Sequence, residues 1–285
     1  MSKNQQTLTI GAVAYDPKVV TIWDMMRSYF QENNFPVDYV LFSNYEAQVD
    51  SLLNGFIDIA WNTNIAYVRV QNALDGKAKV LAMRDTDINF TTKIIARTDR
   101  GIQSLSDLYG KKVAFGSADS GQAAILPYHF LKKNGLDPEK DIQLTRFDLD
   151  VGKHGDTGTS EYEVLRALKE GEVDAGAVGE STWIRMIEQG LVNTNEIKGI
   201  WTSPGYSHCN FTVLPDFQND LAQKFTNLLL AMDPNQADIR KLMELEGLNE
   251  WVTAEGEGIE GYNVIYEAME DQSLLANKEP VVKLY

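Results

Sequence analysis

Hydrophobic positions along the chain follow two different periods. Short apolar runs of strand length alternate with longer segments in which apolar residues recur every three or four positions. This alternation predicts an α/β protein. The predicted strands cover residues 7–14, 37–42, 57–61, 79–84, 91–96, 112–116, 142–146, 175–179, 197–201 and 210–213. The predicted helices cover residues 18–33, 45–54, 65–74, 105–109, 122–134, 162–170, 181–188, 216–232, 236–245 and 262–272.

One turn pattern recurs between these elements. Gly55, Gly110 and Gly171 each follow a helical segment and precede a buried strand. Glycine suits this position because it adopts the left-handed backbone that commonly ends a helix. Ser104 stands where it can cap the short helix that Gly110 ends.

The order and spacing of five segments resemble the type II periplasmic-binding-protein fold. Within it they resemble the phosphate, phosphite and phosphonate substrate-binding proteins of ABC transporters. The segments are Leu-Leu-Asn-Gly-Phe-Ile-Asp-Ile-Ala at 52–60, the block from Gly101 to Gly116, Ser120-Gly121 with Leu126-Pro127, Leu-Lys-Lys-Asn-Gly-Leu-Asp-Pro-Glu-Lys-Asp at 131–141, and Gly-Glu-Val-Asp-Ala-Gly-Ala at 171–177.

The resemblance implies two α/β lobes joined by two crossover strands, with the ligand held in an interlobe cleft. The crossovers are expected at residues 91–97 and 208–214. Lobe one would then be discontinuous, with residues 1–90 plus 211–285, and lobe two would contain residues 91–210. The resemblance also implies an ABC permease as partner. No cofactor is expected.

Charge and composition exclude several other classes. The chain has 26 Lys and Arg against 41 Asp and Glu, a formal net charge of −15. Without a basic patch, nucleic acids and anionic membrane surfaces are poor partners. The apolar runs are shorter than a membrane-spanning helix requires, so a soluble protein without membrane insertion is expected. The sequence carries neither a dinucleotide-binding nor a phosphate-loop glycine motif.

The single cysteine, Cys209, can form neither an intramolecular disulfide nor a cysteine metal cage. No two histidines stand four residues apart, so no metal is expected. The first residues are polar and contain no secretory signal. We therefore expect a periplasmic or other extracytoplasmic location if a signal was removed, and a cytoplasmic one if the sequence is the complete gene product.

A polar loop between a strand and a helix is the main candidate for a ligand site. It contains Ser117, Asp119, Ser120, Gly121 and Gln122. Free N–H groups at a helix start, together with hydroxyl donors, can hold an oxyanion. An ordinary helix cap by Ser120 or Asp119 is the alternative. Asp119 departs from the family pattern, because it puts a carboxylate where the anion would be held.

Three further positions are candidate ligand contacts. Asn62 and Thr63 follow a buried strand, and Tyr15 follows the first strand, where open α/β sheets bind ligands. Helix capping and cover of a core edge are the alternatives. Arg84 is a candidate clamp for a carboxylate or phosphonate, with a local ion pair to Asp85 or Asp87 as the alternative.

Reactive side chains leave an enzyme hypothesis open. His154 lies in a glycine-rich loop and is a candidate ligand donor or general acid–base group. Together with Asp156, His208 and Cys209 it forms the catalytic set of the alternative hypothesis. A solvated loop histidine and a buried structural cysteine are the simpler interpretations. His129 is expected to be structural.

These observations predict a protein that binds a small oxyanion of the phosphonate or phosphate ester class and passes it to an ABC permease. The alternative is a cytoplasmic lyase or decarboxylase built on the same fold and acting on a small carboxylated substrate.

Overall fold

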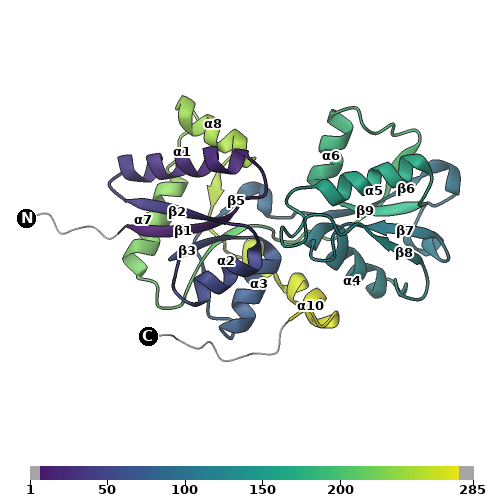
Figure 1. Ribbon diagram of the computed structural model, residues 1–285, viewed down its shortest axis with the longest axis horizontal. Helices are drawn as coiled ribbons and strands as arrows, with labels where there is room; N and C mark the ends of the chain where they lie inside the picture. The colour runs from purple at the N-terminus through teal and green to yellow at the C-terminus, as the bar shows by residue number, and fades with distance from the viewer. Residues whose placement is uncertain (1–6, 276–285) are drawn as a thin grey trace, which may run out of the picture. The chain divides into compact units, whose positions relative to one another are not determined.

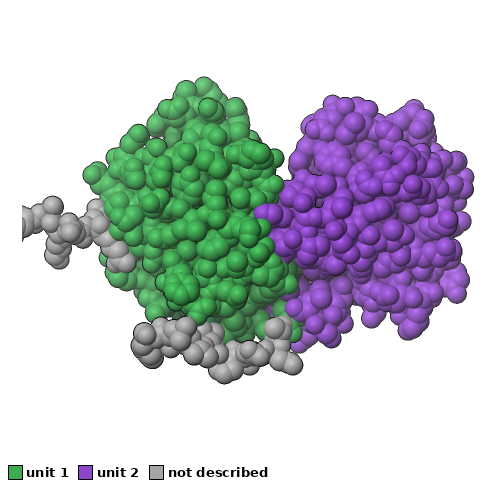
Figure 2. All heavy atoms as spheres, viewed as in Figure 1, with its two compact units in different colours: residues 1–89, 207–263, 275–285 green, residues 90–206, 264–274 purple. Residues whose placement is uncertain are grey.

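The computed structural model describes residues 7–275, which form two compact units. Unit 1 contains residues 7–89 and 207–263, together with Leu275 (Figure 2). Unit 2 contains residues 90–206 and 264–274. The chain therefore passes from one unit to the other after Asn89, Tyr206, Asn263 and Leu274.

Unit 1 is built on a five-stranded sheet. Its strand order is β2 (Val37–Phe42), β1 (Leu8–Val13), β3 (Ile59–Asn62), β11 (Asn210–Val213) and β4 (Lys79–Val80). β1 pairs in parallel with β2 and β3, whereas β11 runs antiparallel to β3 and β4. The parallel strands therefore end at one common edge, where loops that bind ligands are usually found.

Helices cover both faces of this sheet. Unit 1 has an apolar cluster on each face of its sheet. Three helices pack against the larger cluster: α1 (Lys18–Glu32), α7 (Asn219–Leu230) and α8 (Ala237–Glu246). α2 (Tyr45–Leu53) and α3 (Asn64–Ala73) cover the opposite face (Figure 1). Phe30 of α1 stacks on Phe225 of α7 with ring centroids 4.8 Å apart. This arrangement buries both apolar sides of the central strands.

Unit 2 has its own five-stranded sheet. The strand order is β10 (Ile197–Thr202), β6 (Thr92–Arg97), β9 (Ala175–Gly179), β7 (Lys112–Phe115) and β8 (Gln143–Arg146). β7 pairs in parallel with β8 and β9, and β6 runs antiparallel to β9 and β10. The α/β class predicted from the hydrophobic pattern is confirmed.

Four α-helices belong to unit 2. α5 (Thr159–Glu170) and α6 (Glu180–Glu188) cover one face of the sheet, and α4 (Leu126–Lys133) packs on the other (Figure 1). α10 (Asn263–Asp271) lies almost wholly in this unit, where Lys133 of α4 contacts Glu267 at 2.7 Å. The domain division predicted from the sequence places this C-terminal segment in lobe one.

Three elements differ in form from the prediction. The strand expected at 79–84 is divided into β4 and β5 (Met83–Arg84), because β5 leaves the sheet to pair with β12 (Trp251–Val252). The short helix expected at 105–109 is a 3₁₀ helix, η3 (Leu105–Leu108). The helix expected at 122–134 begins with a π-helical turn, η4 (Gly121–Ile125), before α4.

The remaining short elements are the 3₁₀ helices η1 (Asp85–Asp87) and η2 (Thr98–Arg100) and the single-turn α9 (Glu257–Glu260). No helix within residues 7–275 combines the length and the apolar character needed to cross a bilayer.

Candidate functional site

The carboxyl ends of β7, β8 and β9 bring three chain segments to one edge of unit 2. β7 lies between β8 and β9 and is parallel to both, so the residues that follow each strand are neighbours. The loop after β7, Ser117–Gln122, is called the anion loop here. The segment after β8, residues 147–158, is called the covering loop. The third segment is the start of α6.

Ser120 begins the helix that follows the anion loop. Its hydroxyl oxygen accepts a hydrogen bond from the N–H of Ala123 at 3.1 Å, so the helix cap expected as an alternative is present. The hydroxyl keeps its own proton for donation. As first-turn groups, the N–H groups of Gly121 and Gln122 have no acceptor earlier in the helix. Capping and anion binding are therefore compatible at this position.

Asp119 joins the anion loop to the covering loop. One oxygen, Oδ2, accepts from the backbone N–H groups of Gly152 at 2.6 Å and His154 at 3.2 Å. A second link joins the N–H of Ala118 to the Asp148 carboxylate at 2.8 Å. The carboxylate that departs from the family pattern thus holds two loops together.

The covering loop lies directly against Ser120 and Gln122. Gly155 has φ +89°, and a Cβ atom there would clash with the Ser120 hydroxyl and approach Gln122 Nε2 to 2.7 Å. Glycine is therefore required both for the backbone conformation and for the contact. His154 beside it is buried and also has positive φ, 51°. His154 thus lies in a packed turn, and the solvated loop histidine of the simpler interpretation is not what the structure contains.

Glu161 is a functional candidate that the sequence analysis missed. It lies in the first turn of α5, completely buried, and accepts from the N–H of Gly179 at 2.7 Å and from Gln122 Nε2 at 3.2 Å. Burial raises the pKa of Glu161 to about 7, although these hydrogen bonds oppose the rise. Its spacing from Val164, Leu165 and Leu168 puts its carboxyl group on the buried face of an amphipathic helix. From the sequence, this spacing could have identified Glu161 as a buried acidic residue.

The corresponding edge of unit 1 is simpler. β3 ends at Asn62, and Thr63 caps α3 by accepting from the N–H of Ala66 at 3.3 Å. Asn62 Oδ1 accepts from Gln48 Nε2 at 2.8 Å, and the Asn62 Nδ2 donor is buried with no partner among the described residues. Both predicted residues are therefore buried at the strand end, and Asn62 retains a donor.

Neighbouring polar residues were not predicted. Asn210 lies opposite Asn62 in the β3–β11 pairing and donates to the Tyr262 hydroxyl at 2.9 Å. The Tyr262 ring packs against Tyr67 with centroids 4.5 Å apart. Tyr15 is half-buried against the main apolar cluster of unit 1, as expected for a residue that covers a core edge.

Arg84 forms the local ion pair that was its alternative role. Its guanidinium donates to both oxygens of Asp87, at 2.6 and 2.7 Å, and to the carbonyl of Glu246 at 2.7 Å. Burial alone would raise the pKa of Asp87, but Arg84 and His208 lower it to about 2. Arg84 is thus fully engaged inside unit 1, so we leave it out of the proposed ligand contacts.

Asp87, His208 and Cys209 form the one described group of side chains whose spacing suits a metal ion. Their ligand atoms lie within 4.8 Å of one another, and all three residues are buried. His208 Nδ1 contacts Cys209 Sγ at 3.0 Å. However, Arg84 already occupies both Asp87 oxygens, and its fixed positive charge beside the site opposes a cation.

The residues of the enzyme hypothesis are divided between the two units. His208 and Cys209 belong to unit 1, whereas His154 and Asp156 belong to unit 2. The N–H of Asp156 closes a turn onto the carbonyl of Lys153 at 3.0 Å. Cys209 is buried next to His208, close to the carboxylate of Asp87 that pairs with Arg84.

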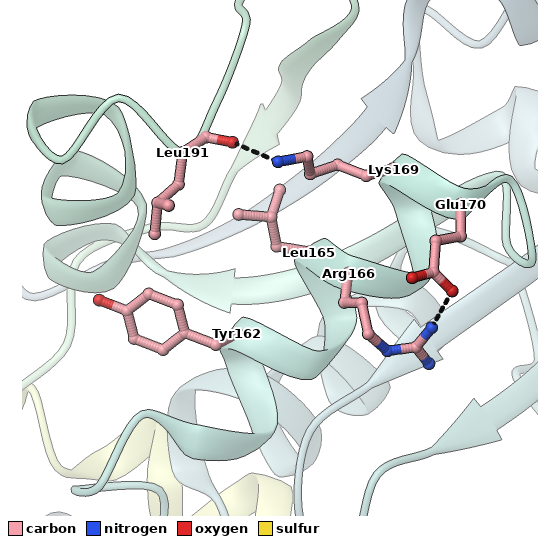
Figure 3. A pocket seen from close by; sticks show the side chains of 6 residues that line it. All are labelled: Tyr162, Leu165, Arg166, Lys169, Glu170 and Leu191. Atoms are coloured by element: carbon pink, nitrogen blue, oxygen red, sulfur yellow. Dashed lines mark hydrogen bonds and ion pairs between the residues drawn. The ribbon is translucent and has the colours of Figure 1, made fainter.

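A surface pocket of about 340 Å³ lies on the outer side of α5 (Figure 3). Its lining residues are Tyr162, Leu165, Arg166, Lys169, Glu170 and Leu191. The Lys169 ammonium donates to the Leu191 carbonyl at 3.2 Å, and Arg166 pairs with Glu170. The charged ends are therefore satisfied within the protein, and none of the predicted site residues lines this pocket.

Comparison with known proteins decides the family. Residues 10–257 match the family model described as ABC transporter, phosphonate, periplasmic substrate-binding protein. The chain belongs to this family. The resemblance seen in the sequence is therefore confirmed, as is the function class of substrate-binding component of an ABC transporter.

Two relatives illustrate the sequence similarity. The chain is 22% identical over 229 residues to a probable ABC transporter phosphite binding protein, PhnD1, of Prochlorococcus marinus strain MIT 9301, covering 77% of this chain and 74% of that protein. It is 24% identical over 217 residues to the phosphate-import protein PhnD of Mycolicibacterium smegmatis. This match covers 70% of this chain and 63% of that protein.

Solved structures share the fold. PhnD1 of P. marinus in complex with methylphosphonate gives a TM-score of 0.72 at 19% identity, covering 95% of this chain and 99% of that one. The periplasmic aliphatic sulphonate binding protein SsuA of Escherichia coli gives a TM-score of 0.65 at 15% identity. This match covers 97% of this chain and 96% of that one. The predicted type II periplasmic-binding-protein fold is therefore confirmed, and the fold alone does not separate phosphonate from sulfonate.

Proposed function

We propose that this member of the phosphonate-binding family binds a phosphonate or a related phosphorus oxyanion at the anion loop and delivers it to an ABC permease. The observation that carries the proposal is the Ser120 helix start. It offers a hydroxyl proton and the first-turn N–H groups of Gly121 and Gln122 at the carboxyl edge of a parallel strand. Phosphonate oxygens are acceptors that suit these donors.

The proposed contacts in unit 2 are Ser120, Gly121, Gln122 and His154. Ser117 is left out, because its hydroxyl donates to the carbonyl of Leu149. In unit 1 they are Tyr15, Asn62 and Thr63. Asn62 supports this assignment most strongly, because its buried Nδ2 donor has no acceptor among the described residues and an oxyanion would supply one. Asp119 supports the site indirectly by holding the covering loop in place.

The closing of two lobes on the ligand and the docking of a permease stay predictions that follow from family membership. Family members are periplasmic substrate-binding proteins, so an extracytoplasmic location is the coarser statement that the family supports. A change in the radius of gyration on adding methylphosphonate, measured by small-angle scattering, would test closure.

Isothermal titration calorimetry on protein refolded to remove carried-over ligand tests the binding proposal. We expect one-to-one binding of methylphosphonate or phosphite, weaker binding by simple carboxylates, and a large loss of affinity in Ser120→Ala. Ser106→Ala is the matched control, since Ser106 is an exposed hydroxyl in the same unit. If no oxyanion binds to the refolded protein, the proposal fails.

The enzyme alternative makes a different prediction. If His154 or His208 transfers a proton, His154→Ala or His208→Ala would abolish turnover of a small carboxylated substrate while binding is retained. On our account neither the unmodified protein nor the variants turn over such a substrate. Proton NMR spectra of carboxylated phosphonates incubated with the protein check this, and product formation would favour the enzyme.

A further inference from the structure

The amide of Gln122 has a fixed orientation. Its Nε2 donates to Glu161 Oε1 at 3.2 Å, and the other Glu161 oxygen accepts from the N–H of Gly179 at 2.7 Å. The Gln122 Oε1 acceptor is buried and has no donor among the described residues. Because Gln122 lies in the anion loop with its amide group against Gly155, this oxygen belongs to the proposed site.

A second acceptor in the same loop is also unused. Asp119 Oδ2 is occupied by the N–H groups of Gly152 and His154, but Asp119 Oδ1 is buried without a donor among residues 7–275. A buried acceptor without a donor costs about 1–3 kcal/mol. The anion loop therefore combines the donors of a helix start with two buried oxygens that have no donor among the described residues.

Local charge points in the same direction. Asp119 and Glu161 are both acidic, and none of the described arginine or lysine side chains makes an ion pair with either of them. Arg185 of α6 acts on Glu161 only at longer range. A fully deprotonated dianion would meet the Asp119 carboxylate here, whereas an anion that keeps a proton carries less charge and brings the missing donor.

We propose that the anion loop selects a tetrahedral oxyanion that keeps one O–H group, such as a hydrogen phosphonate or hydrogen phosphite, and rejects sulfonates and sulfate, which have no O–H group. This inference rests on the proposed function and specifies its ligand. It goes beyond the fold, since phosphonate-binding and sulphonate-binding proteins share this architecture.

A site with buried hydrogen-bonding groups binds a ligand that leaves those groups unpaired much more weakly than a ligand that pairs them. Methylphosphonate and methanesulfonate have nearly the same shape and differ in the proton. We expect methylphosphonate to bind the unmodified protein at least about 100-fold more tightly than methanesulfonate does. Titration calorimetry at pH 6.5 with each compound measures the ratio.

The substitution Asp119→Asn tests the role of the unused Asp119 Oδ1 acceptor. Asparagine keeps an oxygen for the Gly152 and His154 N–H groups but replaces the unused oxygen with an N–H donor. We expect the phosphonate-to-sulfonate ratio to fall at least about 10-fold, with a gain in sulfonate affinity. Asp148→Asn removes the same charge from the neighbouring loop while keeping an oxygen for the Ala118 N–H, and we expect its ratio to match that of the unmodified protein.

The outcomes separate this inference from the proposed function. Equal affinity for the two compounds in the unmodified protein overturns the inference and leaves the proposed function standing. An equal fall in the ratio for Asp119→Asn and Asp148→Asn also overturns it, because charge alone would then explain the selectivity. Absence of binding by both compounds defeats the proposed function and the inference together. Unfolding transitions of each variant, followed by circular dichroism, confirm that the folded proteins are being compared.

Discussion

Asp87 in unit 1 and Glu161 in unit 2 are both completely buried carboxylates, yet their surroundings are opposite. Asp87 is paired with Arg84, and its pKa is lowered to about 2. Glu161 has only neutral hydrogen-bonding partners, and burial raises its pKa to about 7. Asp87 therefore stays charged and stabilises the fold. Glu161, beside the anion loop, can change its charge near neutral pH.

The difference separates a structural residue from a residue near a ligand site. A buried ion pair that is complete in the folded protein has no group left for a ligand, so Arg84 and Asp87 are explained by stability alone. Glu161, by contrast, orients a glutamine whose other amide atom is unused. A carboxyl group whose pKa burial moves toward neutral pH, next to a loop with unused polar atoms, is therefore the stronger marker of a functional site in this protein.

The largest expected effect is that of Asp87→Asn. The substitution leaves the Arg84 charge buried without its main partner, and we expect the free energy of unfolding to fall by about 3–5 kcal/mol. Urea unfolding at pH 7 measures it. Asp99→Asn, at an exposed pair with Arg97, is the control and should change stability little. A small loss for Asp87→Asn would mean that the pair is not the structural device described here.

Glu161→Gln should change how stability depends on pH. In the unfolded chain Glu161 ionises near 4.5, whereas in the folded protein it stays protonated up to about 7. Because the folded state binds the extra proton between these values, stability falls as pH rises through this window. At about 1.4 kcal/mol per pKa unit, the contribution is about 3 kcal/mol.

We therefore expect the loss of stability between pH 5 and pH 8 to be about 2.5 kcal/mol smaller in Glu161→Gln than in the unmodified protein, because part of the contribution is already lost at pH 5. Urea unfolding at the two pH values provides the comparison. Glu163→Gln on the same helix should retain the unmodified pH dependence. If the slope of Glu161→Gln matches that of the unmodified protein, Glu161 is charged in the folded state and the contrast with Asp87 disappears.

Gly155→Ala is expected to have a smaller effect, on ligand affinity. A Cβ atom at this position clashes with Ser120 and displaces the covering loop from Gln122. We expect methylphosphonate affinity to fall about 10-fold, or about 1.4 kcal/mol. Gly158→Ala is the matched control, since its φ is +68° but its Cβ would meet nothing closer than 3.6 Å. Equal losses in calorimetric titrations of the two variants would show that backbone strain alone is responsible.

Much of the fold could be predicted from the sequence because local patterns determine it. Period-two and period-3.6 patterns, together with glycines after helices, located most of the elements, and the start of the helix at Ser120 follows from its cap. β12 was missed because it has two residues and depends on its partner β5. The placement of α10 with unit 2 depends on tertiary contacts such as that between Lys133 and Glu267.

The candidate site was predictable only in part. Strand ends followed by polar residues indicated Asn62, Thr63 and Ser120, because parallel strands end at a common edge. The roles of Arg84 and Asp119 were ambiguous, since a charged side chain can bind a ligand or a neighbouring residue. Which of these occurs depends on residues distant in sequence, such as Glu246 for Arg84 and Gly152 for Asp119.

A crystal structure of the protein with methylphosphonate tests the central claim most directly. We predict phosphonate oxygens within hydrogen-bond distance of the Ser120 hydroxyl and of the Gly121 and Gln122 N–H groups, with one P–O group facing Gln122 Oε1 or Asp119 Oδ1. Methylphosphonate bound elsewhere, with no contact to the anion loop, would contradict the account.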